Sequence, residues 1–398
     1  MIRHLLRLVW NRKRSTALII LEIFVSFLVL FAVATMGFYF HENWRRPLGY
    51  SYENVWNVGL DVKQTTDDVW SPEMSQKFAT LLRELRGMPE IESVAGIFSP
   101  PYSNSTSLMS REMANKRIED IEVNQATDGL LAVLKLDLVR GRWFEPADDA
   151  LDWKPVVIDQ ELSKAVFGDN DPIGKLLSGS GDTVPWKVVG VVSDFRRSGE
   201  LSGPGLYMFE RQRVGDVSDR PPRNFVVRLR PGTSARFEEQ LVRRLGAVVR
   251  DWSFEVETLV AKRESALRLR LAPLLVMGTV AGFLLLMVGL GLMGVVWQNV
   301  TRRTKEIGLR RAMGATGGSV CGQVLGELLL ITTIGLALGT VLVVQLPLLD
   351  LVAFIGPGAY IRGLATAIGA MYVLTLLSGL YPSRLAARVQ PAEALHYE

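Results

Sequence analysis

The chain has 398 residues, a formal net charge of +4 and one cysteine, Cys321. A single cysteine excludes an internal disulfide and a thiolate zinc cluster, and three histidines far apart in sequence argue against a histidine-based metal site. The small net charge gives no support to a nucleic-acid partner. The hydrophobic share of 48% is concentrated in a few stretches, and this clustering predicts the architecture.

Four apolar stretches are long enough to cross a bilayer, which takes roughly 20 residues in a helix. The predicted spans are 16–40, 271–297, 321–346 and 363–382. The first is too long for a signal peptide and no small-residue cleavage site follows it. Gly and Ala are frequent in the last three spans, as in helices that pack closely in lipid. The first span has only Gly37, so we expect it at the edge of the bundle.

Residues 41–270 separate the first two spans and read as a mixed α/β domain. A strand–helix–strand pattern at 54–98, with Ser71 as the helix cap, recurs at 224–259 and flanks an insertion at about 100–222. We therefore predict an α+β membrane protein whose large extracytoplasmic domain has two lobes, a ferredoxin-like part and an inserted one. The charged helix 260–270 is expected to run directly into the second span as a continuous stem.

Basic residues in short segments predict the orientation of the spans. Lys and Arg cluster in residues 1–15, in 298–320 and in the tail 383–398, whereas 347–361 of the short 347–362 connection has none. Both termini and the 298–320 segment are therefore expected in the cytoplasm. The domain 41–270 and the 347–362 loop are then on the opposite side.

Acidic residues are the main candidates for chemistry inside the spans. Glu22 and Glu327 each lie near the predicted cytoplasmic end of a helix. An intramembrane acid is costly and often functional. We interpret each as reaching the interface or pairing with a nearby base, with a proton relay as the alternative. Outside the spans, the pairs Asp67–Asp68 and Asp148–Asp149 are interpreted as solvated turns.

Sequence motifs for enzyme chemistry are absent. The chain contains no GxxxxGK[ST], GxSxG or HExxH motif and no Cys–His pair. We therefore predict no catalytic, cofactor-binding or metal-binding residue in it.

The segment KEIGLRRAMG, residues 305–314, lies between the second and third spans. It combines an apolar stripe of Ile307, Leu309 and Met313 with charges on the remaining face. A topology signal needs only positive charge. The ordered alternation of acid, apolar residue and base therefore favours a binding surface.

The run RRTKEIGLRRAMGATGGSV at 302–320 resembles the permease domain of the MacB/FtsX/LolC family of ABC transporters. The positions that match the family pattern are Glu306, Ile307, Gly308, Arg311, Ala312, Gly314, Ala315 and Glu327. The tail YPSRLAARVQPAEALHYE resembles the family's ending. Stretches from 139 to 195 resemble the MacB-type periplasmic domain, so the resemblance covers nearly the whole chain.

The resemblance implies a dimeric inner-membrane permease that transmits ATP-driven motion to its periplasmic domain. ATP and Mg²⁺ would be bound by a partner ATPase dimer and not by this chain. The segment 298–320 would be the helix that docks on that ATPase. The residues implied in coupling are Arg303, Lys305, Glu306, Ile307, Gly308, Leu309, Arg310, Arg311 and Gly314.

Other partners follow from the same resemblance. They are a second permease copy or a sister permease, a periplasmic membrane-fusion protein, and membrane lipid. Full MacB carries an ATPase domain ahead of its first span, whereas this chain begins about a dozen residues before that span. The ATPase is therefore expected from another gene.

Export or efflux of a substrate from the periplasm is the function we expect. The alternatives are a lipoprotein-release permease of the LolC/LolE type and an FtsX-like regulator of a cell-wall hydrolase, whose ectodomains are generally smaller. A signalling receptor is a third alternative, but the predicted cytoplasmic parts are short for an output domain.

Overall fold

The computed structural model of the chain describes residues 13–62, 71–104, 106–113, 116–177, 184–214, 222–302, 309, 313, 316–352 and 354–387. Its internal contacts divide the chain into two compact units. The helical unit comprises Met1–Glu42 and Arg270–Glu398, and the sheet unit comprises Asn43–Leu269. The first predicted span therefore folds with the last three, although the whole sheet unit separates them in sequence.

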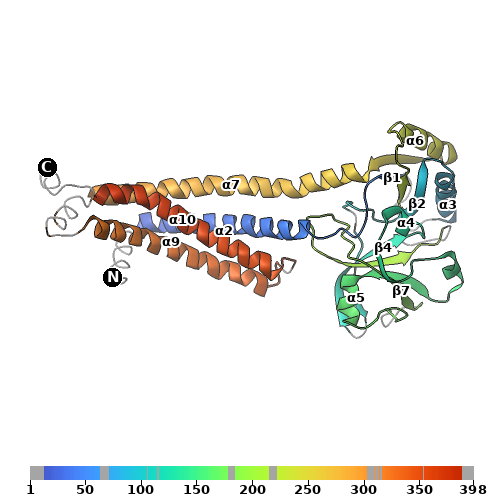
Figure 1. Cartoon of the computed structure of the whole chain (residues 1–398), viewed down its shortest axis with the longest axis horizontal. Helices are drawn as coiled ribbons and strands as arrows, with labels where there is room; N and C mark the ends of the chain where they lie inside the picture. Colours follow the sequence, from blue (N-terminus) through green and yellow to red (C-terminus); the bar gives the residue numbers. More distant parts are fainter. Residues whose placement is uncertain are drawn as a thin grey trace. The chain divides into compact units, whose positions relative to one another are not determined.

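Among the residues that the structure describes, four helices are long and apolar enough to cross a membrane (Figure 1). They are α2 (Lys13–Trp44), α7 (Leu259–Arg302), α9 (Gly317–Leu348) and α10 (Pro357–Ala387). Each helix extends beyond the span predicted for it, because hydropathy marks the part that suits lipid and not the end of the helical backbone. Helix α10 begins at a proline, whose fixed φ suits the first turn. The connection after α9 is thus shorter than the predicted 347–362 loop.

Helix α2 lies in the core of the helical unit, so the prediction that it lies at the edge is wrong. Ile23 and Phe27 of α2 are fully buried against the other helices. The glycines that allow this close approach belong to α9. A Cβ built on Gly335 would lie 2.7 Å from Ile23 Cγ2, and one built on Gly339 would lie 2.7 Å from Phe27 Cε1. A helix that lacks glycines can therefore still be central when its neighbour supplies them.

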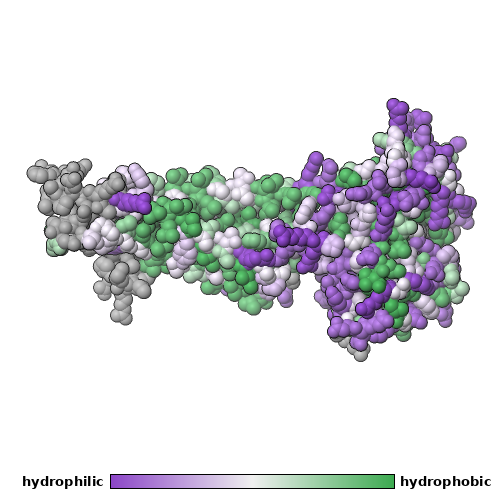
Figure 2. All heavy atoms as spheres, in the orientation of Figure 1, coloured by the Kyte–Doolittle hydropathy of each residue, from purple (hydrophilic) through white to green (hydrophobic). Residues whose placement is uncertain are grey.

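Helix α7 is instead the most exposed of the four. Only 11% of its most apolar segment is buried, against 39% in α9. On the face seen in Figure 2, the described part of the helical unit is mostly apolar (green). An apolar exterior of this kind suits contact with lipid or with another apolar helix.

The sheet unit contains the predicted ferredoxin-like part. Its elements are β1 (Val55–Val62), α3 (Pro72–Arg86), β2 (Ile91–Ile97), β9 (Asn224–Leu229), α6 (Phe237–Val248) and β10 (Trp252–Thr258). The four strands lie in the order β10-β1-β9-β2 and all neighbouring pairs are antiparallel. Ser71 caps α3 as predicted, since its Oγ accepts a hydrogen bond from the Met74 N–H at 3.3 Å.

The inserted residues continue the same sheet. Their elements are β3 (Leu108–Met113), β4 (Lys116–Ala126), α4 (Leu130–Leu134), β5 (Leu138–Gly141), the 3₁₀ turn η1 (Pro146–Ala150), β6 (Lys154–Asp159), α5 (Gln160–Phe167), β7 (Trp186–Val192) and β8 (Leu206–Arg211). The strand order runs on from β2 as β4-β8-β6-β7-β5, with β3 paired to β4. Strands β2 and β4 meet at the single pair Ile97↔Ala126.

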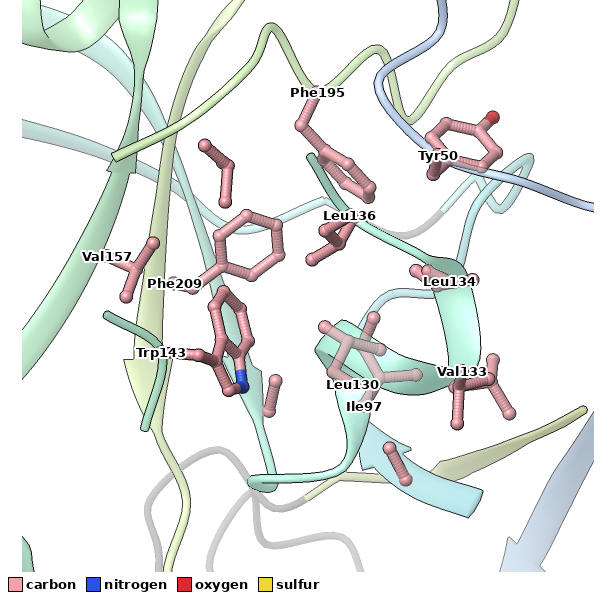
Figure 3. Close-up of a cluster of buried hydrophobic side chains, with 14 of the residues drawn as sticks. Tyr50, Ile97, Leu130, Val133, Leu134, Leu136, Trp143, Val157, Phe195 and Phe209 are labelled. Carbon is pink, nitrogen blue, oxygen red and sulfur yellow. The ribbon is translucent and has the colours of Figure 1, made fainter. Parts of the chain in front are cut away.

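One apolar cluster joins the two parts of this sheet. Successive side chains of a strand point to opposite faces. On one face, Ile97 of the ferredoxin-like part and Val157 and Phe209 of the insertion belong to one cluster with side chains of α4 (Figure 3). On the other face, separate clusters lie under α3 with α6 and beside α5. The shared cluster explains why the predicted lobes form a single compact unit.

Candidate functional site

The predicted coupling segment lies between the end of α7 at Arg302 and the start of α9 at Gly317. Of its proposed coupling residues, Leu309 is in the described part of the chain. Arg303, Lys305, Glu306, Ile307, Gly308, Arg310, Arg311 and Gly314 are outside the described residues. Their role therefore stays a prediction.

Two apolar side chains of this segment are exposed. Leu309 is 53% exposed and Met313 is 74% exposed. The Met313 N–H donates to the Leu309 carbonyl at 3.0 Å, which places the two side chains one helical turn apart. Thr316 then caps α9, because its Oγ1 accepts from the Ser319 N–H at 3.4 Å. Two exposed apolar side chains next to each other form the kind of surface that binds a protein partner.

The intramembrane acids lie on two different helices of the unit. Glu22 of α2 is partly buried, and its carboxylate lies against α7. A Cβ built on Gly291 would lie 3.1 Å from Glu22 Oε2, so glycine at this position leaves room for the carboxylate. Glu327 of α9 is also partly buried. The prediction that each acid reaches the interface or pairs with a base, and the alternative of a proton relay, both stay predictions.

Helix α7 is one unbroken helix of 44 residues. Its first residue, Leu259, is fully buried in the sheet unit's shared cluster, and Ala266 packs against the same cluster. The Ala261 N–H donates to Thr258 Oγ1 at 3.0 Å, which caps the first turn. The predicted stem at 260–270 is therefore anchored in the sheet core and continuous with the apolar segment that follows it.

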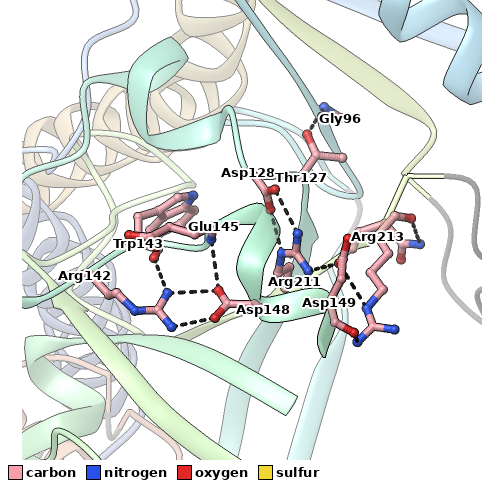
Figure 4. A network of polar contacts seen from close by, with 11 residues as sticks. Gly96, Thr127, Asp128, Arg142, Trp143, Glu145, Asp148, Asp149, Arg211 and Arg213 are labelled. Carbon is pink, nitrogen blue, oxygen red and sulfur yellow. Dashed lines mark hydrogen bonds and ion pairs between the residues drawn. The ribbon is translucent and has the colours of Figure 1, made fainter. Parts of the chain in front are cut away.

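The prediction of a solvated turn is wrong for Asp148, which is only 2% exposed, whereas the Asp149 side chain is 58% exposed. Asp148 accepts hydrogen bonds from Arg142 Nη2 at 2.5 Å, from Arg142 Nη1 at 2.9 Å and from the Glu145 N–H at 2.9 Å (Figure 4). Neighbouring Arg211 pairs with Asp128 at 2.7 Å and with Asp149. These ion pairs hold the local fold together. Arg142, six residues before Asp148, is the feature of the sequence that could have predicted this pairing. Asp67 and Asp68 are outside the described residues.

We expect Asp148→Asn to lower the free energy of unfolding by about 1–3 kcal/mol at neutral pH, since it leaves the Arg142 charge without its partner. Burial raises the pKa of Asp148, but Arg142 and the Glu145 N–H together hold this pKa below its ordinary value. The stabilisation is therefore complete above the pKa of an unfolded Asp, 3.8, and is lost as the pH falls through the folded value.

Thermal unfolding of the full chain in detergent, followed by tryptophan fluorescence across this pH range, measures the difference. The matched control is Asp152→Asn at an exposed neighbouring position, which should change stability by less than about 0.5 kcal/mol. Equal effects of the two variants at neutral pH would contradict the prediction.

Within the described ranges, no group of three or more His, Cys, Asp and Glu side chains is arranged to hold a metal ion.

Two family profiles match the chain. The MacB-like periplasmic core domain matches residues 16–244, and the FtsX-like permease C-terminal domain matches residues 278–391. The macrolide export ATP-binding/permease protein MacB of Hahella chejuensis is 28% identical over 83% of this chain and 50% of its own length. The pyoverdine export ATP-binding/permease protein PvdT of Pseudomonas savastanoi pv. phaseolicola is 24% identical over 79% of this chain and 49% of its own length.

The chain therefore spans about half the length of the curated relatives it matches. Among solved structures, the periplasmic region of MacB from Actinobacillus actinomycetemcomitans is 17% identical, with a TM-score of 0.38. That match covers 52% of this chain and 89% of the other.

Proposed function

Because this chain belongs to the family of ABC transporter permeases that join a MacB-like periplasmic core domain to an FtsX-like permease domain, we propose that it transmits the motion of a separate ATPase dimer across the inner membrane. The sheet unit is the periplasmic domain. In the proposal both termini and the 298–320 segment are cytoplasmic, and ATP and Mg²⁺ are bound by the ATPase. The output is export of a substrate from the periplasm. The relatives are named as macrolide and pyoverdine exporters, which supports export over lipoprotein release or regulation.

The observation that carries this proposal is the continuity of α7. A helix of 44 residues at about 1.5 Å per residue is about 66 Å long. One end is fixed in the core of the periplasmic domain through Leu259, and the other ends beside the coupling segment at Arg302. A hydrogen-bonded helix resists axial stretching, so displacement at the coupling segment reaches the periplasmic domain.

A proline gives α7 one defined point of bending. Pro273 lies inside the helix and has no N–H, so the Leu269 carbonyl receives no helical hydrogen bond. Leu269 is the last residue of the periplasmic unit. Helices kink at prolines while their length is preserved. In the proposed mechanism α7 therefore transmits displacement along its axis and accommodates rotation at this turn.

A flexible insertion in α7 tests the proposal. The chain is reconstituted in nanodiscs with the ABC ATPase that co-purifies with it, and Cys321 is replaced by Ser. Spin labels at Glu255→Cys and Leu348→Cys, both at exposed positions, report the distance between the two units. We expect this distance to change when ATP is trapped. A Gly-Ser-Gly-Ser insertion after Leu269 should abolish the change and leave ATP hydrolysis in place.

The same insertion after Gly232, in an exposed turn with open space around it, is the matched control and should preserve the change. A wild-type chain without any ATP-dependent distance change, or one that responds normally with α7 interrupted, would falsify the proposal.

A further inference from the structure

One loop of the periplasmic domain contacts both the chain leaving α2 and the start of α7. Residues 195–203, here named the latch loop, follow strand β7. The Arg196 N–H donates to the Leu48 carbonyl at 3.0 Å, shortly after α2 ends. Glu200 forms an ion pair with Arg263 in the second turn of α7. All of these residues belong to the same compact unit.

Arg196 holds the segment that leaves α2. Its side chain is 1% exposed and among the largest fully buried side chains of the described chain. The guanidinium donates to the Arg46 carbonyl at 2.8 Å, to the Glu200 carbonyl at 2.5 Å and to the Ser202 carbonyl at 2.6 Å. A planar guanidinium with five N–H groups can bridge two backbone segments in one fixed geometry. Arg196 thus fastens the chain at 46–48 to the latch loop.

Glu200 holds the start of α7. The Arg263 Nε donates to Glu200 Oε1, and the side chain of Glu200 is 8% exposed while that of Arg263 is 21% exposed. The Arg263 guanidinium also lies 5.1 Å from the ring centroid of Tyr52 and 5.8 Å from that of Trp44, the last residue of α2. Arg263 therefore contacts both the latch loop and the end of α2.

We propose that Arg196, Glu200 and Arg263 form a latch that makes the ends of α2 and α7 move together with the periplasmic domain. The proposal rests on the proposed function, in which α7 carries the displacement. The pairing matters because separating a buried ion pair leaves a charge without a partner, which is strongly unfavourable. A pull on α7 is therefore passed to the latch loop and to residues 46–48 instead of being absorbed by side-chain motion. These are positioning residues and bind no substrate.

Hydrogen exchange of the full chain in nanodiscs, without any ATPase, tests whether the latch ties these segments. Glu200→Gln keeps the size of the side chain and removes the charge that holds Arg263. We expect backbone amides of the latch loop and of 46–50 to exchange about tenfold faster than in the wild type. The control Glu239→Gln removes the exposed ion pair with Arg243 and should leave these rates unchanged. If these amides exchange at the wild-type rate in Glu200→Gln, the latch proposal is overturned.

The ATP-dependent distance between labels at Glu255→Cys and Leu348→Cys tests transmission. We expect Glu200→Gln to reduce the responding fraction about threefold or more, with a thermal unfolding midpoint near that of Glu239→Gln. Because the two residues act as a pair, Glu200→Gln with Arg263→Gln should be no worse than either single variant. A normal distance change in Glu200→Gln overturns the transmitting role. A wild-type chain without the change overturns the proposed function instead, and hydrogen exchange then decides the latch by itself.

Discussion

Reversing charge at Glu306→Lys together with Arg310→Glu is expected to reduce stimulation of the partner ATPase about tenfold or more. The segment 302–320 holds one acidic residue, Glu306, among basic and apolar ones, and in the proposed function it docks on the ATPase. Charge pairs set the register of such an interface, and losing one partner of a desolvated pair costs about 2–5 kcal/mol. A loss of 1.4 kcal/mol is already tenfold in affinity.

ATP hydrolysis by the reconstituted complex, compared with that of the ATPase alone, measures the stimulation. Arg268→Glu is the matched control, since Arg268 is an 84% exposed basic residue of α7 outside the coupling segment. The Arg268→Glu variant should stimulate ATP hydrolysis to the wild-type level. If the Glu306/Arg310 variant stimulates ATP hydrolysis as the wild type does, the predicted coupling role of this segment is wrong.

Replacing Gly339 by Leu is expected to disrupt the helical unit. A Cβ at this position would already lie 2.7 Å from Phe27 Cε1, and Phe27 is fully buried in the core between the helices. Overpacking of a filled core costs about 1–3 kcal/mol and displaces the neighbouring element. We therefore expect a thermal unfolding midpoint about 5 °C lower or more in detergent. The ATP-dependent distance change should be lost as well, because α2 can no longer pack on α9.

Gly369→Leu is the control for this variant. Gly369 lies on α10 with nothing within 4 Å of its built Cβ, and leucine is the better helix former. Its midpoint should equal or exceed that of the wild type. Equal midpoints for the two leucine variants would contradict the packing derived from Gly339 and Phe27.

Much of the architecture could be predicted from local patterns. Four apolar stretches of sufficient length predict four long helices, and these are present. The strand–helix–strand repeats predict a ferredoxin-like part, and the strands and helices of both repeats are present. Ser71 followed by a proline predicts a capped helix start, and α3 begins there. Each of these predictions depends only on residues close in sequence.

Two predictions were wrong because they left out the contacts that a residue makes in the folded chain, with a partner near in sequence for Asp148 and far in sequence for α2. Asp148 reads as a solvated residue in its own loop, yet folding buries it against Arg142 and the Glu145 N–H. Helix α2 has few glycines, yet Gly335 and Gly339 of α9 bring it into the core. Hydropathy and the spacing of residues do not predict which side chain will contact a given position in the folded chain.

Local patterns along the chain are sufficient to predict the four apolar helices, the α/β character of the domain between the first two, and the resemblance to ABC permeases. Periodicity and apolar length fix these features within each segment. The packing of the folded chain, in contrast, decided that the two parts of the domain share one core cluster. It also decided that Arg196 and Glu200 connect the chain leaving α2 to the start of α7. Those contacts join residues 46, 196 and 263, and the geometry of the folded backbone, not the local pattern, brings such positions together.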